Sequence, residues 1–159
     1  MKKKIFAIAT IAVLAFSFGG CTNTTTKISS EIGMANPWED VDSLSAAEEK
    51  IGFEMEVPED AFDEVSSYRV CAGLNEIEVQ YEDGSYIRKA KDDGDISGDY
   101  SEYKYTQDVT VGENTVTLKG DSEDEISLAI WISGDYSYAV GAGEAVDTQT
   151  MSSIVEGVN

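Results

Sequence analysis

Clustered carboxylates are the residues of this sequence whose spacing best suits a chemical role. The segment 92–102, called the acidic loop below, begins Asp-Asp-Gly-Asp-Ile-Ser-Gly-Asp and ends in Glu102. Oxygen ligands at alternate positions suit Ca²⁺, and Gly98 at the sixth position from Asp93 matches an EF-hand loop. Lys104 occupies the twelfth position, where a glutamate is required, and neither flank has a helical pattern. The segment is therefore either a solvated connector built from turn residues or a weak calcium site. The ligands of that site would be Asp93, Asp95, Ser97 and Asp99.

Other catalytic groups are scarce. The chain has no histidine, which excludes Ser-His-Asp and Cys-His nucleophile systems in their usual form, and zinc sites with histidine ligands. A glycosidase needs two carboxyl groups about 5–10 Å apart, and no spacing selects one pair from the 31 acidic residues. Seven aromatic side chains offer either a platform for a sugar or peptide or ordinary cross-strand packing. They are Trp38, Tyr100, Tyr103, Tyr105, Trp131, Tyr136 and Tyr138.

The charge of the chain limits its partners. Eleven basic residues stand against 31 acidic ones, a formal net charge of −20 at pH 7. Removing residues 1–20, which hold three lysines and no acid, leaves 8 against 31 and a charge of −23. Such a charge repels nucleic acid and anionic lipid head groups, and it attracts cations or a basic partner. The 42% of hydrophobic residues are sufficient for the core of one folded domain.

The first 21 residues have the layout of a secretory signal. Three lysines precede an apolar run from Ile5 to Phe18, and two glycines lead into Cys21. The run is too short for an ordinary membrane span. It resembles a bacterial lipoprotein signal, in which the leader is cut before the cysteine and the thiol is lipidated, although Phe18 stands where leucine is usual. We expect residues 1–20 to be a signal peptide, and acyl chains such as palmitate on Cys21 to anchor the protein to the cell membrane, facing outside the cytoplasm.

The rest of the chain divides into a tether and one domain. Residues 21–35 are rich in Ser and Thr and lack a periodic apolar pattern, which predicts a flexible tether. A single domain is expected over residues 36–159. If Cys21 carries lipid, Cys71 has no disulfide partner, and its strand-like surroundings predict a buried thiol.

The apolar pattern of residues 36–159 predicts an α+β fold. Asp42 or Ser43 can cap a short helix that ends at Ile51, before Gly52. From residue 68 onward the period changes to two, with hairpins across Asp83-Gly84 and two later turns. Those later hairpins pair 105–111 with 115–119 and 126–133 with 136–141. Asp147 then caps a helix whose apolar stripe is Met151, Ile154, Val155 and Val158. We expect a mainly antiparallel sheet of about six or seven strands, a short N-terminal helix and a C-terminal helix.

The register of the first hairpin decides where Arg88 lies. If Asp83-Gly84 alone forms the loop, Val79 faces Arg88, and Glu78 pairs with Lys89 as an exposed cross-strand ion pair. That register places Arg88 on the apolar face of the sheet, where it needs a carboxylate partner. We therefore predict a structural ion pair between a buried Arg88 and a carboxylate of the acidic loop.

Short segments in a fixed order carry a family resemblance. They include Ile87–Ala90 and Asp95–Tyr100, and further pieces are Asn36-Pro37-Trp38, Val57-Pro58, Val116–Gly120 and Tyr136–Tyr138. Together they resemble small bacterial lipoproteins with a domain of unknown function that also occurs at the extracytoplasmic end of some anti-sigma-factor-like membrane proteins. The resemblance implies an exported α+β domain without established activity, and it supplies no catalytic residues.

These observations favour a binding protein over an enzyme. We expect a membrane-tethered extracytoplasmic lipoprotein that binds or senses an envelope protein or a small ligand, without nucleic acid and without a cofactor other than the weak calcium candidate. The alternative is a small carboxylate-dependent hydrolase of polysaccharide or peptidoglycan.

Overall fold

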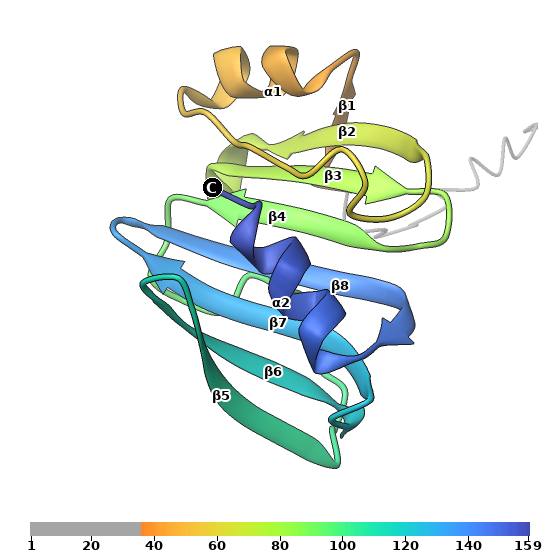
Figure 1. Ribbon diagram of the computed structural model, residues 1–159. Coiled ribbons are helices and arrows are strands. Elements are labelled where there is room, and N and C mark those ends of the chain that lie inside the picture. Colours follow the sequence, from red (N-terminus) through yellow and green to blue (C-terminus); the bar gives the residue numbers. More distant parts are fainter. Residues whose placement is uncertain (1–35) are drawn as a thin grey trace, which may run out of the picture. The chain divides into compact units, whose positions relative to one another are not determined.

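A computed structural model describes residues 36–159, and eight strands of this part form one antiparallel sheet (Figure 1). The predicted signal peptide, Cys21 and the predicted tether lie outside the described residues. The strands are β1 (Glu39–Val41), β2 (Val65–Cys71), β3 (Glu76–Tyr81), β4 (Tyr86–Ala90), β5 (Tyr105–Val111), β6 (Asn114–Ser122), β7 (Glu125–Ser133) and β8 (Tyr136–Val146). The helices are α1 (Leu44–Ile51), α2 (Thr148–Glu156) and a single 3-10 turn, Ala72–Leu74.

The sheet consists of two four-stranded meanders. Its order is β1-β2-β3-β4-β8-β7-β6-β5, so that the last strand of each meander pairs with the other at the centre. The mainly antiparallel sheet and the two helices agree with the prediction, but the strand count of six or seven was too low. The additional strand is β1, which has three residues and is too short to show an alternating pattern.

Both helices begin at the residues that the sequence indicates. The side chain of Ser43 accepts a hydrogen bond from the Ala46 amide, and Gly52 ends α1 in the left-handed conformation. Asp147 accepts a hydrogen bond from the Thr150 amide at the start of α2. Neither α1 nor α2 has the length and hydropathy of a membrane span.

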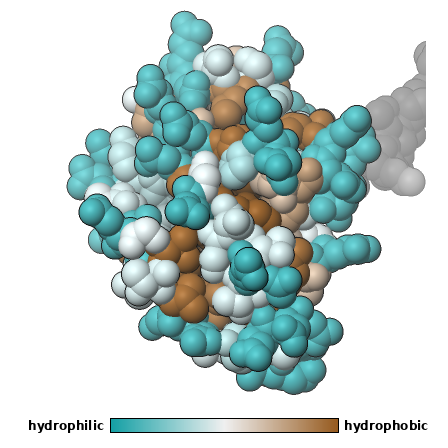
Figure 2. All heavy atoms as spheres, in the orientation of Figure 1, coloured by the Kyte–Doolittle hydropathy of each residue, from teal (hydrophilic) through white to brown (hydrophobic). Residues whose placement is uncertain are grey.

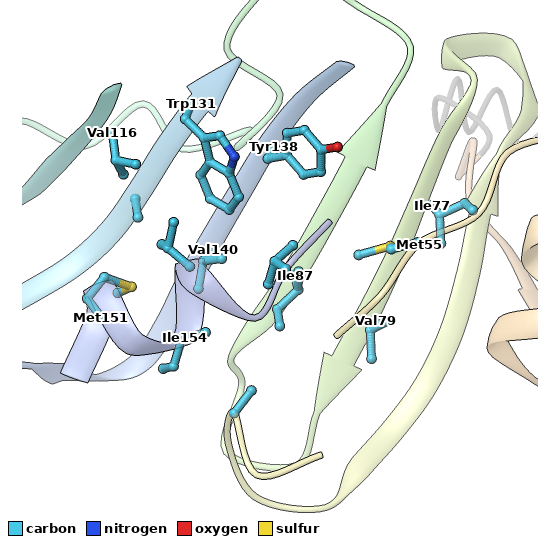
Figure 3. Close-up of a cluster of buried hydrophobic side chains, with 14 of the residues drawn as sticks. Met55, Ile77, Val79, Ile87, Val116, Trp131, Tyr138, Val140, Met151 and Ile154 are labelled. Atoms are coloured by element: carbon cyan, nitrogen blue, oxygen red, sulfur yellow. The ribbon is translucent and has the colours of Figure 1, made fainter. Parts of the chain in front are cut away.

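The hydrophobic core lies between the helices and one face of the sheet, called the core face. Ala47 of α1 and Met151 of α2 join one buried cluster with Ile77, Ile87 and Val140 of the strands (Figure 3). The predicted stripe on and after α2 is buried in this cluster. Seen from the helix side, hydrophilic side chains cover much of the surface and hydrophobic atoms show between them (Figure 2).

The hairpin between β3 and β4 has a different register from the predicted one. The amide of Tyr81 donates to the Ser85 carbonyl, and Gly84, with φ 88°, donates back to the Tyr81 carbonyl. This is a three-residue loop with glycine at the left-handed position. It shifts the pairing by one residue, so that Glu78 faces Arg88. A shift of one residue exchanges the faces of a strand, and Arg88 therefore lies on the opposite face, called the polar face.

Lys89 occupies the core face instead. It is opposite Ile77, and its Nζ donates to the Glu54 carbonyl at 2.8 Å. The ammonium lies 4.6 Å from the ring centre of Tyr136 and 5.3 Å from that of Tyr138. Burial lowers the pKa of Lys89. The predicted exposed Glu78–Lys89 ion pair is wrong, because these two side chains lie on opposite faces of the sheet.

Candidate functional site

A row of charged side chains crosses the polar face at β2, β3 and β4. Arg69, Glu78 and Arg88 are cross-strand neighbours. Oε1 of Glu78 accepts hydrogen bonds from Nε and Nη2 of Arg69, and Oε2 accepts one from Nε of Arg88 at 2.6 Å. The Glu78 side chain is 0% exposed. Two guanidinium partners offset the cost of burying this carboxylate.

Aromatic rings cover the two guanidinium groups. Arg69 and Arg88 each lie 5.2 Å from the centre of a Trp38 ring, and Arg88 lies 4.5 Å from that of Tyr86. Tyr86 in turn lies against Gly141, where an added Cβ would be 2.2 Å from the tyrosine ring. These contacts fix Arg88 between its ion pair and the rings.

The acidic loop crosses the polar face because of the strand order. The chain leaves β4 at the centre of the sheet and must pass β8, β7 and β6 to reach the edge strand β5, about 19 Å at ordinary strand spacing. Its contacts follow this path. The Ser137 hydroxyl of β8 donates to the Asp92 carbonyl at 2.9 Å. Lys119 of β6 lies 3.4 Å from an Asp95 oxygen.

Arg88 fixes the middle of this loop. Its Nη1 donates to the carbonyls of Ile96 (3.0 Å) and Ser97 (2.8 Å), and the Tyr86 hydroxyl also donates to Ser97. The partner predicted for Arg88, a carboxylate of the acidic loop, is therefore wrong: the loop offers carbonyls, and the carboxylate belongs to Glu78. The cause is the hairpin register, which places Arg88 beside β3 glutamates.

Three of the four predicted calcium ligands, Asp95, Ser97 and Asp99, are linked by hydrogen bonds within the acidic loop. Asp95 accepts from the Ser97 amide, and this bond and the Lys119 ammonium outweigh burial and lower the Asp95 pKa. Asp99 accepts from the Tyr103 hydroxyl and the Ser101 amide, which lower its pKa. Asp93 is exposed.

No group of three or more Asp, Glu, Cys or His side chains in residues 36–159 is arranged to hold a metal ion. Calcium binding by Asp93, Asp95, Ser97 and Asp99 stays a prediction, which a calcium titration tests. Cys71 is a free, buried cysteine at the end of β2.

Glu76 differs from every other acid on the polar face. It is 3% exposed, and its Oε1 accepts no hydrogen bond within the described part of the chain. Nε of Arg88 is 3.7 Å away and donates to Glu78 instead. Burial raises the pKa of Glu76 from 4.5 to about 7, against the opposing charge of Arg88 and with the support of Glu78 and Asp92. Glu76 is thus a buried acceptor whose hydrogen bonding is incomplete.

Glu76 lines a hollow of about 290 Å³, called the Glu76 pocket below. Its walls include Trp38, Leu74, Arg88, Ile96 and Tyr100, and Asp92 and Asp95 also border it. Leu74 is 56% exposed and Tyr100 is 96% exposed. The pocket therefore combines a buried carboxyl group with apolar and aromatic walls, a combination typical of small-molecule sites.

A second hollow, the loop groove, lies on the other side of the acidic loop. It has a volume of about 580 Å³, and its lining includes Asp93, Asp95, Glu113, Thr117, Ile130 and Ile132. A third, of about 500 Å³, is bordered by Asp92, Asp93 and the turn at Gly134-Asp135. Each of the three hollows is lined by two aspartates of the acidic loop.

Sequence reasoning missed Glu76, because its alternation with Ile77 is equally typical of an exposed strand face. The signal that could have found it is the pair Arg69 and Arg88 in strands on either side, which becomes visible only with the correct register. No protein-family model, curated protein or solved structure matches this chain.

Proposed function

We propose that this protein is a membrane-tethered binding domain that works outside the cytoplasm and recognises a positively charged envelope ligand or partner at its polar face. The observation that carries the proposal is that three hollows border one loop, the acidic loop. The loop is held in place by hydrogen bonds from Arg88, Tyr86 and Ser137. Its aspartates therefore form fixed walls, as a preorganised binding surface requires.

Charge favours a basic partner. Asp92, Asp93 and Asp95 border the hollows, and Glu113 adds a fourth carboxylate at the loop groove. Two of the cations nearby already have partners, since Arg88 pairs with Glu78 and Lys119 with Asp95. Lys91 also borders the third hollow, where Asp92, Asp93 and Asp135 outnumber it. With a net charge of −20 over the chain, the field of the whole molecule attracts cations as well.

The anchor is a separate part of the proposal. A lipid on Cys21, followed by a tether, would hold the domain close to the membrane surface and restrict its partners to the cell envelope. More than one acyl chain is needed for durable attachment. The resemblance to lipoproteins with an extracytoplasmic domain of unknown function supports the same location.

Binding of a charged probe tests the proposal. The full-length chain in mild detergent is titrated into a fluorescent lysine-rich peptide and into its glutamate-rich counterpart, and anisotropy is measured at two salt concentrations. We expect the basic peptide to bind, with an affinity that falls as salt rises. The variant Asp93→Asn/Glu113→Gln should weaken binding, whereas Glu59→Gln/Asp60→Asn, with the same change of charge away from the hollows, should weaken it less. Equal binding of both peptides, or equal loss in both variants, contradicts the proposal.

One observation favours the hydrolase alternative. A general acid for glycoside hydrolysis needs a raised pKa, and Glu76 has a pKa of about 7 in a pocket that Asp92 also borders. Saturable release of soluble fragments from peptidoglycan, lost in Glu76→Gln and in Asp92→Asn, would support this alternative over binding alone.

A further inference from the structure

The two glutamates of the polar face have unequal numbers of partners. Glu78 accepts hydrogen bonds from both Arg69 and Arg88. Glu76, two residues earlier on the same face of β3, has an Oε1 without any hydrogen bond in residues 36–159. Burial of an acceptor without a donor is unfavourable. A ligand that donates a hydrogen bond to Glu76 therefore gains binding free energy, because it satisfies an acceptor that the protein leaves without a donor.

Arg88 donates no hydrogen bond to Glu76. The Arg88 Nε lies 3.7 Å from Glu76 Oε1, but it donates to Glu78, while Nη1 donates to two carbonyls of the acidic loop. Asp92 and Asp95 add negative charge at the border of the pocket. The group that the pocket lacks is accordingly a cation with N–H donors.

Apolar side chains surround this acceptor. Among residues 36–159, four large hydrophobic side chains are exposed, and two of them, Leu74 and Tyr100, line the Glu76 pocket. Ile96 and Trp38 add further apolar surface. An apolar body a few carbons long would cover Leu74 and Tyr100, and a cation next to Tyr100 gains from the face of its ring.

We propose that the Glu76 pocket binds a primary ammonium group carried on a short apolar body. The ammonium donates to the Glu76 carboxylate, and the apolar body lies against Leu74 and Tyr100. The pocket volume of about 290 Å³ is just below the range for drug-sized ligands, about 300–1,000 Å³, and so suits a smaller molecule. This inference rests on the proposed binding function and narrows it to one ligand chemistry at one pocket.

Binding of a cation changes the protonation of Glu76. With a pKa of about 7, a large part of the free protein carries the neutral carboxyl group at neutral pH. The ammonium favours the carboxylate, so the proton leaves Glu76 for the buffer as the ligand binds. Ammonium binding is therefore coupled to proton release.

Calorimetry with simple amines tests the proposal on the full-length chain in mild detergent. The probe is n-butylammonium chloride at pH 7, titrated in two buffers of different ionisation enthalpy to count released protons. n-Butanol has the same apolar body without charge, and tetramethylammonium has the charge without N–H donors. We expect butylammonium to bind about tenfold or more tightly than either control, with proton release. Equal binding of butylammonium and either control overturns the proposal.

Variants locate the site. Glu76→Gln should weaken butylammonium binding about tenfold or more and abolish proton release. Tyr100→Ala, at a position too exposed to affect folding, should weaken binding a few fold. Glu59→Gln, which removes an exposed carboxylate away from the hollows, should leave it unchanged. Unchanged binding in Tyr100→Ala and in a folded Glu76→Gln overturns the proposal, and Tyr100→Ala alone decides it if Glu76→Gln does not fold.

Capped peptides identify the source of the ammonium. An end-blocked Gly-Lys-Gly and its acetyl-lysine analogue are titrated in the same way. Binding of the lysine peptide but not the analogue assigns the pocket to a lysine side chain of a partner, and binding of butylammonium alone assigns it to a free amine. If neither the lysine peptide nor butylammonium binds, the ammonium proposal fails. The lysine-rich peptide and Asp93→Asn/Glu113→Gln still test the broader function at the loop groove.

Discussion

Two glutamates on one strand face show how strongly local partners determine the chemistry of a side chain. Glu78 lies between two guanidinium groups and accepts hydrogen bonds at both oxygens. Glu76 is buried to a similar degree, yet only Arg88 is close and at 3.7 Å. Desolvation therefore dominates at Glu76 and raises its pKa. The consequence is an acid that titrates near neutral pH in the middle of a charged network.

The pH dependence of stability should carry the signature of Glu76. Its pKa is about 7 in the folded chain and 4.5 ordinarily, so between these values the folded state binds more protons than the unfolded state. Stability from this group is then fully present below pH 4.5 and is lost as pH rises through 7, by a few kcal/mol at most. Urea unfolding at a series of pH values measures this slope.

The variant Glu76→Gln provides the control. It cannot ionise, so the fall in stability between pH 4.5 and 7 should disappear, and the variant should be more stable than the original chain at alkaline pH. Loss of stability below pH 4 should persist in both proteins, because Asp95 and Asp99 have lowered pKa values in the folded state. An identical slope in the two proteins would contradict the assignment to Glu76.

Arg88→Met should destabilise the domain strongly. The change leaves the buried Glu78 with one cation instead of two and removes both hydrogen bonds to the acidic loop. Breaking one side of a buried ion pair costs about 3–5 kcal/mol, and Arg69 will keep the loss near the lower value. Hydrogen exchange should also become faster at the amides of the acidic loop.

Lys104→Met is the matched control for this change. Lys104 forms an ion pair with Asp121, but the side chains are 78% and 56% exposed. An exposed pair contributes about 0–1 kcal/mol. Urea denaturation of both variants should therefore separate them clearly, and similar losses would show that the burial of the Arg88 network has little energetic importance.

Among the elements, those whose signals are local could be predicted from the sequence. Ser43 and Gly52 mark the ends of α1, and Asp147 marks the start of α2, because caps depend on a few adjacent residues. The hairpin around Gly134 also pairs as predicted. At Gly112 the two expected strands pair, but Asn114 already belongs to β6 and faces Val111, so the loop is one residue shorter than the predicted strand bounds imply. Strand β1 could not be found, since it consists of three residues that form a strand only by pairing with β2.

The hairpin around Gly84 shows why the site escaped prediction. An Asp-Gly pair fits both a two-residue loop and the longer loop that forms here, and the sequence does not distinguish them. Choosing the first exchanges the faces of β4, so that Arg88 appears apolar-facing and Lys89 exposed. Both the Glu78 network and the Glu76 pocket depend on this register. Arg69 of β2 and Arg88 of β4 lie on the same face as Glu78 only when β3 and β4 pair as observed.

Gly98 is the position where the backbone of the acidic loop depends most on glycine. Its φ is +66°, and an added Cβ would lie 2.9 Å from Nη1 of Arg88. Gly98→Ala should therefore cost about 1–3 kcal/mol through strain and displace the loop from Arg88. Gly94→Ala is the control, because its Cβ would meet only an ordinary contact at 3.5 Å. Equal stability of the two variants in urea would contradict this account of the loop.

At the scale of the whole molecule, topology determines where the proposed binding surface lies. The two meanders meet at β4 and β8, while β5 begins the second meander at the far edge. Strands β8, β7 and β6 lie between β4 and β5, so the connection has to cross one face of the sheet, and it crosses the polar face. Helices cover the core face, but a single loop covers the other face incompletely, and hollows remain on either side of it. The strand order thus places the aspartates of the acidic loop on the polar face, where they border the hollows.

In the proposed anchoring, the location of the whole molecule depends on one thiol, that of Cys21. If Cys21 is the lipidated residue, Cys21→Ser should abolish incorporation of labelled palmitate and leave the chain as a longer precursor that keeps residues 1–20.

Cys71→Ser is the matched control, because it removes the second of two cysteines. Cys71 is buried at the end of β2 and is inaccessible to an acyltransferase in the folded domain. The measurement is palmitate labelling of the expressed chain, with the intact mass of the product. Palmitate label retained in Cys21→Ser would exclude an anchor at Cys21. Label lost in Cys71→Ser would assign the lipid to Cys71, inside the folded domain, and would contradict the predicted tether. An anchor at Cys21 fits the binding proposal, because the predicted tether over residues 21–35 would give the domain roughly 20 Å of reach from the membrane, at about 5–6 Å × √n for a flexible chain.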